Sequence, residues 1–291
     1  MRFPHFPHFP HFPFFSPLSH ALLALALCLT APLAWADLSL FPTRVVLEPN
    51  QRAAQVELMN SGNAPETYRI NLVNRRMGDA GEFMAMDGAA PGHLFADALL
   101  RYSPRQVTVQ PGSSQTVRIL VRKPADLEAG EYRSHLQFDR VADSTDANSI
   151  EQASQPDSKA IGVVLTALVG ASIPIIVRHG ETQASVTLSD LVLLPAAGTG
   201  SPALDFQINR SGTRSVYGDL VVRFTPRDGA PVELAKAGAL AVYVPNLLRR
   251  ARLSLQVPPG TALAGGNLTV SYRDRAEAGG KLLAESSLPL P

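Results

Sequence analysis

Three histidines lie beyond residue 36, and none of them is spaced to hold a metal ion together with another. They are His93, His135 and His179, and the chain contains no H-E-x-x-H motif, which would place two histidines on one face of a helix. His135 falls inside a predicted strand, where packing or surface exposure accounts for a histidine. The chain also lacks the G-x-S-x-G elbow, the P-loop and the G-x-G-x-x-G turn. We therefore predict that the protein is not an enzyme and that it carries no metal and no cofactor.

Arg44 is the first residue that could hold a charged partner. It is a cation in the otherwise apolar segment 38–47. An arginine can bind a carboxylate through two parallel charge-assisted hydrogen bonds. The alternative is an ordinary surface arginine on an edge strand, where a charge discourages aggregation. The residues alone leave both interpretations open.

Residues 161–178 are predicted to form a strand with apolar side chains on both faces. Such a strand must bury both faces, and one of them can pack on the core of its own domain. The other face would be buried either elsewhere within this chain, for example against a second domain, or against another protein. The pattern does not decide between these two.

Short segments of alternating apolar and polar residues make up most of the remaining chain, which is typical of antiparallel β-sandwiches. In the first half they cover residues 38–47, 54–59, 67–73, 107–109, 114–121 and 132–141. In the second half they cover residues 184–194, 203–209, 217–224, 240–244, 251–257 and 267–272. Residues 234–240 have some helical propensity. The predicted fold class is all-β.

Residues 1–36 are typical of a signal peptide. Arg2 is followed by a Phe-Pro-His repeat over residues 3–13, an apolar run over residues 21–30 and the sequence Ala34-Trp35-Ala36. The apolar run is about half of the ~20 residues that cross a bilayer, and the alternative is a buried core helix. We predict that the repeat is an extension removed with the signal, so that the exported chain begins at Asp37. The only cysteine, Cys28, would be lost with it.

The exported part of the chain carries no net charge. The whole chain has a formal net charge of +1, and Arg2 is the only charged residue among residues 1–36. A neutral chain has no global field that would attract nucleic acid or an anionic membrane. The apolar run 161–177 contains Gly162, Gly170 and Pro174 and is rich in β-branched residues, which favours a strand over a membrane helix. We therefore predict no nucleic-acid partner and no integral membrane segment in the mature chain.

Two features divide the exported chain into domains. Residues 143–159 are polar and contain no aromatic residue, so we expect a flexible loop there. The sequence His179-Gly180-Glu181-Thr182 is predicted to be a hinge between domains. The predicted domains are residues 37–178 and residues 179–291, and the second has about the usual size of a β-sandwich.

Four stretches together resemble the periplasmic pilus-assembly chaperones of the bacterial chaperone–usher pathway. Thr43-Arg44-Val45 is similar to the family's first-strand arginine motif, and residues 55–63, ending in MNSGN, are similar to its second strand and the turn that follows. Residues 102–121 resemble its segment with two prolines and a Q-x-V-R sequence. Residues 127–138, LEAGEYRSHLQF, resemble the family signature, with Glu131 at the acidic position. The resemblance covers residues 38–179, and the second domain matches only by size and type.

The resemblance implies two immunoglobulin-like β-sandwich domains in a boomerang arrangement and a location in the periplasm. It implies pilus or fimbrial subunits and an outer-membrane usher as partners. The chaperone would lend the last strand of its first domain to a subunit that lacks one, which is a case of β-augmentation. The side chains that face the subunit would be Val163, Leu165, Ala167 and Val169. A one-residue slip would present Val164, Thr166 and Leu168 instead, and an exposed donor strand would allow the free protein to self-associate.

The resemblance also implies an anchor for the C-terminal carboxylate of the subunit. In the family this carboxylate is held by the first-strand arginine, here Arg44, and by a lysine on the donor strand. Arg178 resembles the arginine that ends the donor strand, and counting back from it places the lysine position at Pro174. Proline has no charge and cannot donate a backbone hydrogen bond. Either another cation replaces the lysine, or Arg44 anchors alone, or the register differs.

A secreted β-sandwich adhesin or carbohydrate-binding module is the alternative function. Such proteins present aromatic side chains on an exposed sheet face or loop. Here Phe41, Tyr68, Phe138 and Phe224 are scattered at positions typical of a core.

Overall fold

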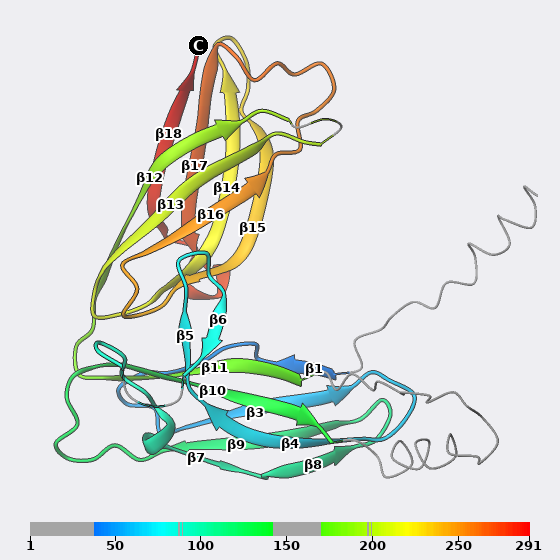
Figure 1. Ribbon diagram of the computed structural model, residues 1–291, viewed down its shortest axis with the longest axis vertical. Helices are drawn as coiled ribbons and strands as arrows, with labels where there is room; N and C mark the ends of the chain where they lie inside the picture. Colours follow the sequence, from blue (N-terminus) through cyan, green and yellow to red (C-terminus); the bar gives the residue numbers. More distant parts are fainter. Residues whose placement is uncertain (1–37, 87, 89, 142–169, 197, 199) are drawn as a thin grey trace, which may run out of the picture. The chain divides into compact units, whose positions relative to one another are not determined.

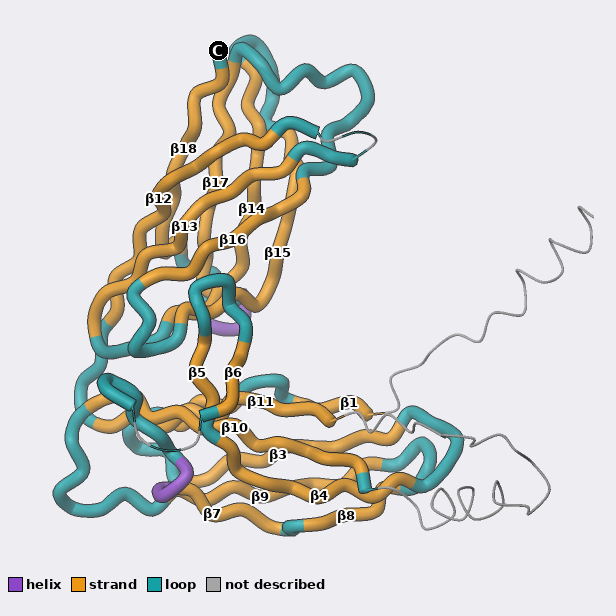
Figure 2. The backbone as a smooth tube through the Cα atoms, in the orientation of Figure 1, coloured by secondary structure: helices purple, strands orange, loops and turns teal. Residues whose placement is uncertain are grey.

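Figure 1 shows the computed structural model, which describes residues 38–291 except 87, 89, 142–169, 197 and 199. The predicted signal peptide and the predicted loop 143–159 lie outside the described residues. Strands account for most of the described chain (Figure 2), and they form two β-sandwiches with separate cores. The all-β prediction is confirmed.

The first sandwich consists of two sheets. One sheet has the order β1 (Leu38–Phe41), β3 (Ala53–Asn60), β9 (Ser114–Val121), β7 (Leu100–Ser103). The other has the order β2 (Val45–Leu47), β11 (Gly170–His179), β10 (Gly130–Arg140), β4 (Glu66–Val73), β8 (Gln106–Val109). Alternation builds the core between them: on β3, Val56 and Leu58 are fully buried while Glu57 and Met59 between and beside them are exposed.

The segment predicted as one strand over residues 38–47 is two strands in different sheets. β1 pairs with β3, whereas β2 pairs in parallel with β11. The chain crosses between the sheets over Pro42, Thr43 and Arg44, and the Phe41–Pro42 peptide bond is cis. Arg44 therefore lies in the bend before β2 and not inside a strand. An alternating pattern records which face a residue occupies but not which sheet its strand joins.

The second sandwich pairs a three-stranded sheet with a four-stranded one. The first has the order β12 (Ala184–Leu194), β13 (Ala203–Gly212), β16 (Leu248–Ser254), and the second has the order β15 (Val232–Val242), β14 (Val216–Pro226), β17 (Gly266–Asp274), β18 (Leu282–Leu290). The residues with helical propensity, 234–240, are in strand β15, because Leu234 packs into the sandwich core and β15 hydrogen-bonds along β14. Sheet pairing here overrides local propensity.

A short hairpin, β5 (Arg75–Met77) and β6 (Phe83–Ala85), links the first sandwich to residues of the second. Met77 is buried in the second core, its carbonyl accepts a hydrogen bond of 2.9 Å from Asn246 Nδ2, and the Asp79 carbonyl accepts one of 2.6 Å from the Arg250 N–H. At Gly81 the φ angle is +92°, and a Cβ there would lie 2.4 Å from the guanidinium of Arg249. The two remaining elements of the described ranges are single turns of 3₁₀ helix, η1 (Asp97–Leu99) and η2 (Ala276–Ala278).

Candidate functional site

Arg44 lies among aromatic side chains of the second sandwich. Its Nη1 donates a hydrogen bond of 2.9 Å to the Tyr243 hydroxyl, and its guanidinium carbon is 4.4 Å from the centre of the Tyr217 ring. The side chain is half-buried. The guanidinium thus stacks on a ring and keeps most of its N–H groups for other acceptors. This is not the environment of an ordinary arginine on an exposed edge strand.

The strand register places Arg44 beside Pro174. β2 runs parallel to β11 with Val45 paired to Ile175, so the residues that precede these two, Arg44 and Pro174, are neighbours just beyond the end of the ladder. On the other side of β11, Pro174 is paired with His135 of β10. The position where the resemblance implied a lysine is therefore next to Arg44, but it is occupied by a residue without charge.

Arg133 is a second cation at this place, and it was not predicted from the sequence. It lies on β10, is only 4% exposed, and its guanidinium carbon is 4.2 Å from the centre of the Tyr243 ring. Its Nη2 donates to the Arg75 carbonyl at 3.1 Å, while its Nη1 is buried without an acceptor among the described residues. Burial lowers the pKa of Arg133 to about 10, and the nearby cation Arg44 acts in the same direction, whereas Tyr243 and the carboxylate of Glu131 act against it. Arg133 remains charged at neutral pH.

The alternation within LEAGEYRSHLQF could have indicated Arg133. Tyr132, Leu136 and Phe138 of β10 belong to the first core. Glu131, Arg133 and His135 alternate with these residues and therefore share the opposite face of the sheet. Arg133 lies two residues from the acidic Glu131 of this motif, on the face of the sheet that also carries Pro174 and Arg44. Its spacing from Glu131 alone could therefore have indicated it.

His135 is a packed histidine, as expected for its place in a strand. It is 1% exposed, neither ring nitrogen has a hydrogen-bond partner in the part of the chain that the structure describes, and the Phe83 ring meets it edge-on at 4.9 Å between centroids. Burial, together with the cations Arg133 and Arg75, lowers the pKa of His135 to about 3. The imidazole is therefore neutral at physiological pH and adds no charge to the site.

Glu131 connects the two sandwiches. One of its oxygens accepts a hydrogen bond of 3.1 Å from Arg178 Nε, and the other accepts one of 3.2 Å from the Ser215 backbone N–H of the second sandwich. Arg178 also forms an ion pair of 2.5 Å with Glu48. The Glu131 side chain is fully buried, and Arg178 provides the opposite charge that a buried carboxylate requires. The acidic position of the signature is thus structural: it holds β10, β11 and the second sandwich together.

Strand β11 has an edge that no described strand pairs with. β10 pairs with β11 over its whole length, but β2 pairs only with Ile175, Ile176 and Val177 on the other side. Residues 170–174 therefore present backbone N–H and C=O groups on that side without a strand partner among the described residues, except that Pro174 has no N–H. The predicted subunit-facing residues Val163, Leu165, Ala167 and Val169 lie outside the described residues.

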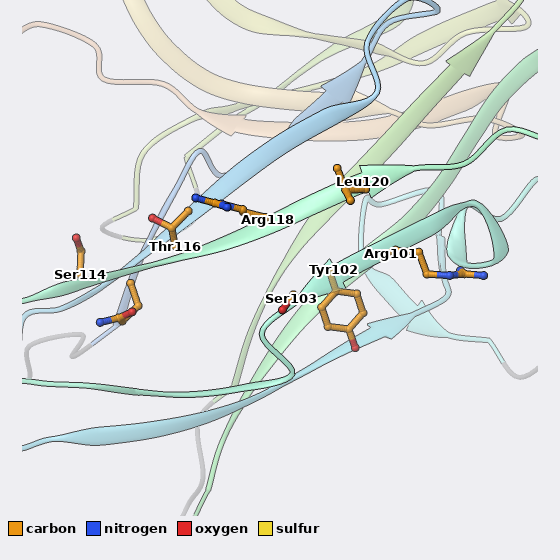
Figure 3. Close-up of a pocket in the computed structure, with 8 residues that line it drawn as sticks. Arg101, Tyr102, Ser103, Ser114, Thr116, Arg118 and Leu120 are labelled. Atoms are coloured by element: carbon orange, nitrogen blue, oxygen red, sulfur yellow. The ribbon is translucent and has the colours of Figure 1, made fainter.

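A concave region of about 620 Å³ lies on the other sheet of the first sandwich, on β7 and β9. Figure 3 shows Arg101, Arg118 and Leu120 among its lining residues, together with the hydroxyl groups of Ser103, Ser114 and Thr116. Arg101 donates to the backbone carbonyls of Ala98 and Leu100. Its lining residues include no acid and no nucleophile–base pair, and its strands β7 and β9 belong to the sheet that does not contain β2, the strand that follows Arg44.

Three of the four aromatic residues named in the sequence analysis are core residues, and one is not. Tyr68, Phe138 and Phe224 are at most 2% exposed, whereas Phe41 is 75% exposed. Phe41 alternates with the half-buried Leu38 and Leu40 on β1 and therefore falls on the outer face, beside Ser39. One exposed phenylalanine at a strand end does not make an aromatic platform.

Within residues 38–291, apart from the gaps given above, no three His, Cys, Asp or Glu side chains gather where they could hold a metal ion. Over the same described ranges, no helix has the length and apolarity needed to cross a membrane.

No protein-family model matches the chain, and no curated protein matches it. Solved structures are similar to the chain. A crystal structure of the YadV chaperone is 12% identical, with 87% of this chain and 100% of that chain covered and a TM-score of 0.44. A chain of the CsuC–CsuE chaperone–tip subunit pre-assembly complex, from the archaic chaperone–usher Csu pili of Acinetobacter baumannii, is 12% identical over 88% of this chain and 100% of that one, with a TM-score of 0.43. A chain of the Salmonella enterica SafA pilin–SafB chaperone complex is 12% identical over 89% and 99%, with a TM-score of 0.40.

Proposed function

We propose that the protein is a periplasmic chaperone that binds pilus or fimbrial subunits by lending them a β-strand and that delivers them to an outer-membrane usher. The observation that carries the proposal is the edge of β11 at residues 170–174, which has no strand partner among the described residues and ends beside Arg44. An exposed sheet edge accepts an added strand through its backbone groups. The apolar residues Val163, Leu165, Ala167 and Val169, which precede this edge in the chain, are the proposed contacts to the subunit.

The direction of β2 supports a role for Arg44 as the anchor of the subunit's C-terminus. β2 lies beside β11, parallel to it, and begins directly after Arg44. A subunit strand that paired with the edge at residues 170–174 would lie on the same side of β11 as β2 and in line with it. If it ran in the same direction as β2, it would end where β2 begins, and its C-terminal carboxylate would meet the guanidinium of Arg44. A carboxylate is the ligand that a guanidinium binds with two parallel hydrogen bonds.

Capture of subunits in the periplasm tests the proposal. The tagged chaperone is produced with the pilin-like proteins of its own genome, and the material that co-purifies is identified by mass spectrometry. We expect a pilin-like subunit with the wild type and none with Arg44→Ala. Arg118→Ala removes an exposed arginine of the other sheet and is the matched control, which should capture as the wild type does. A wild-type protein that co-purifies with no such subunit would contradict the proposed function, and capture by Arg44→Ala would contradict the anchoring role alone.

A further inference from the structure

We propose that Arg133 supplies the second cation of the carboxylate site, in the place that Pro174 leaves without charge. The inference rests on the proposed function, because it takes the ligand to be the C-terminal carboxylate of a bound strand. It assigns to Arg44 and Arg133 together the task of holding one carboxylate group beside the start of β2.

The strand register places Arg44 and Arg133 at adjacent positions on the same face of the sheet. Arg44 is beside Pro174 at the end of β2, and Arg133 is paired with Ile176, two residues further along β11. Residues two apart on a strand point to the same side, so Pro174 and Ile176 face the same way. That face is turned toward the second sandwich, because Ile176 is buried in the second core. The guanidinium of Arg133 on β10 can therefore reach the same region of this face as the end of a long side chain at position 174 would.

Neither arginine forms a direct ion pair with an acid of the described residues, although the charge of Glu131 favours the charged form of Arg133. Arg178, in the next row of the same face, has two acidic partners, Glu48 and Glu131. Arg44 and Arg133 form no ion pair within the described ranges, although Arg133 is 4% exposed and its Nη1 has no acceptor. A buried cation without a counter-charge is unfavourable, and two cations close enough to affect one another add repulsion. An anion that enters this place would reduce both penalties.

Tyr243 positions both guanidinium groups. Its hydroxyl accepts the hydrogen bond from Arg44 Nη1, and its ring lies 4.2 Å from the guanidinium carbon of Arg133. The tyrosine is 5% exposed and is held by the second sandwich, so the two cations share one fixed reference. A carboxylate has two oxygens and can accept from two guanidinium groups at once.

Phe83 covers Arg133 in the free protein. The centre of its ring lies 5.7 Å from the guanidinium carbon of Arg133 and 5.8 Å from the centre of the Tyr243 ring, and the residue is 41% exposed. The side chain stands on the short strand β6 of the hairpin. A carboxylate reaches Arg133 Nη1 when this ring turns aside, so a smaller residue at position 83 should make binding tighter.

The test compares two forms of one synthetic peptide of alternating valine and threonine, one with a free C-terminal carboxylate and one with a C-terminal amide. Binding of each to the purified protein is followed by fluorescence polarisation. For the wild type we expect the carboxylate form to bind more tightly. Arg133→Met should weaken binding of the carboxylate form by about tenfold, the size of one lost charge-assisted hydrogen bond, and leave the amide form unchanged. Arg133→Lys should keep part of the preference, and Arg118→Met should keep all of it.

The possible outcomes separate the inference from the proposed function. If Arg133→Met prefers the carboxylate as strongly as the wild type while Arg44→Ala does not, Arg133 has no part in the site and the inference is wrong. If the wild type binds both forms equally, the carboxylate site is wrong while strand donation stands, and if it binds neither form, the proposed function fails together with the site. Should Arg133→Met not fold, judged by circular dichroism, Phe83→Ala decides: several-fold tighter binding of the carboxylate form supports the inference, and unchanged binding overturns it.

Discussion

The Arg44 guanidinium donates a hydrogen bond of 2.9 Å to the Tyr243 hydroxyl, and these two residues lie in different sandwiches of the chain. The bond does not neutralise Arg44, because a tyrosine hydroxyl is not an anion at neutral pH. The hydrogen bond fixes the orientation of the Arg44 guanidinium and leaves its positive charge available to an anionic ligand. The proposed anchoring of a subunit depends on this arrangement.

Tyr243→Phe should separate orientation from charge at this site. The substitution keeps the ring on which Arg133 stacks and removes only the acceptor for Arg44. We expect subunit capture to weaken several-fold without being abolished, since Arg44 keeps its charge. The loss of one hydrogen bond should lower the free energy of unfolding by about 0.5–1.5 kcal/mol. Capture equal to that of the wild type would show that the orientation of Arg44 is unimportant.

The proposed donor residues can be tested by placing the same charge on either face of the strand. Leu165→Glu should weaken subunit capture by about tenfold or more, because a glutamate cannot be buried in an apolar groove without a large cost. Thr166→Glu is the matched control at the position of the alternate set that is already polar, and it should capture nearly as the wild type does. The reverse order of the two variants in a pull-down would mean that the register is shifted by one residue.

Glu131→Gln should destabilise the protein strongly. The substitution keeps the shape of the side chain but removes the buried negative charge that pairs with Arg178. Breaking a buried ion pair typically costs about 3–5 kcal/mol. Part of this is offset here by Glu48, which also contacts Arg178, so we expect a loss of about 2–4 kcal/mol in urea unfolding.

Glu233→Gln is the control for Glu131→Gln. It breaks the pair of Glu233 with Arg223, in which both side chains are 48% exposed. Exposed pairs contribute about 0–1 kcal/mol. Equal losses in the two variants would mean that Glu131 does not connect the sandwiches as the structure indicates.

His135 should make the protein less stable as the pH falls. Its pKa is lowered to about 3 in the folded protein, mainly by burial, whereas an unfolded histidine titrates near 6.5. Between these values the unfolded chain binds a proton that the folded protein does not, so stability decreases as the pH falls through 6.5. The slope contributed by this residue is at most about 1.4 kcal/mol per pH unit. Urea unfolding between pH 7 and pH 4.5 should show a smaller slope for His135→Leu, and identical slopes would contradict the role of His135.

The sequence predicted most strands, although not β5, β6, β7 or β18, because alternation of apolar and polar residues reflects burial. Strands β9 and β12 have the bounds that the alternating pattern indicated, and Leu188 on β12 is buried between two more exposed neighbours. The hairpin of β5 and β6 was missed because each of its strands has only three residues, too few for a period to be recognised. Its position depends on contacts with Asn246 and Arg250, which are far away in the sequence.

The candidate site could be predicted only in part. Arg44 and the neutral position Pro174 followed from the motifs, and the structure places these two residues side by side. The role of Tyr243 could not follow from the motifs, because it lies about two hundred residues from Arg44 and only the packing of the second sandwich brings it near. Arg133 was within the quoted signature, but its missing acceptor is visible only when its neighbours are known.

The second hydrophobic core is not made by the second sandwich alone. Met77 of the hairpin and Ile176 of β11 are buried in it, and the Ser215 backbone of the second sandwich is bonded to Glu131 of the first. Unfolding of either sandwich would expose these apolar side chains and break this bond. The two sandwiches therefore stabilise each other. Denaturation followed by a probe in each sandwich should give one cooperative transition with a single midpoint.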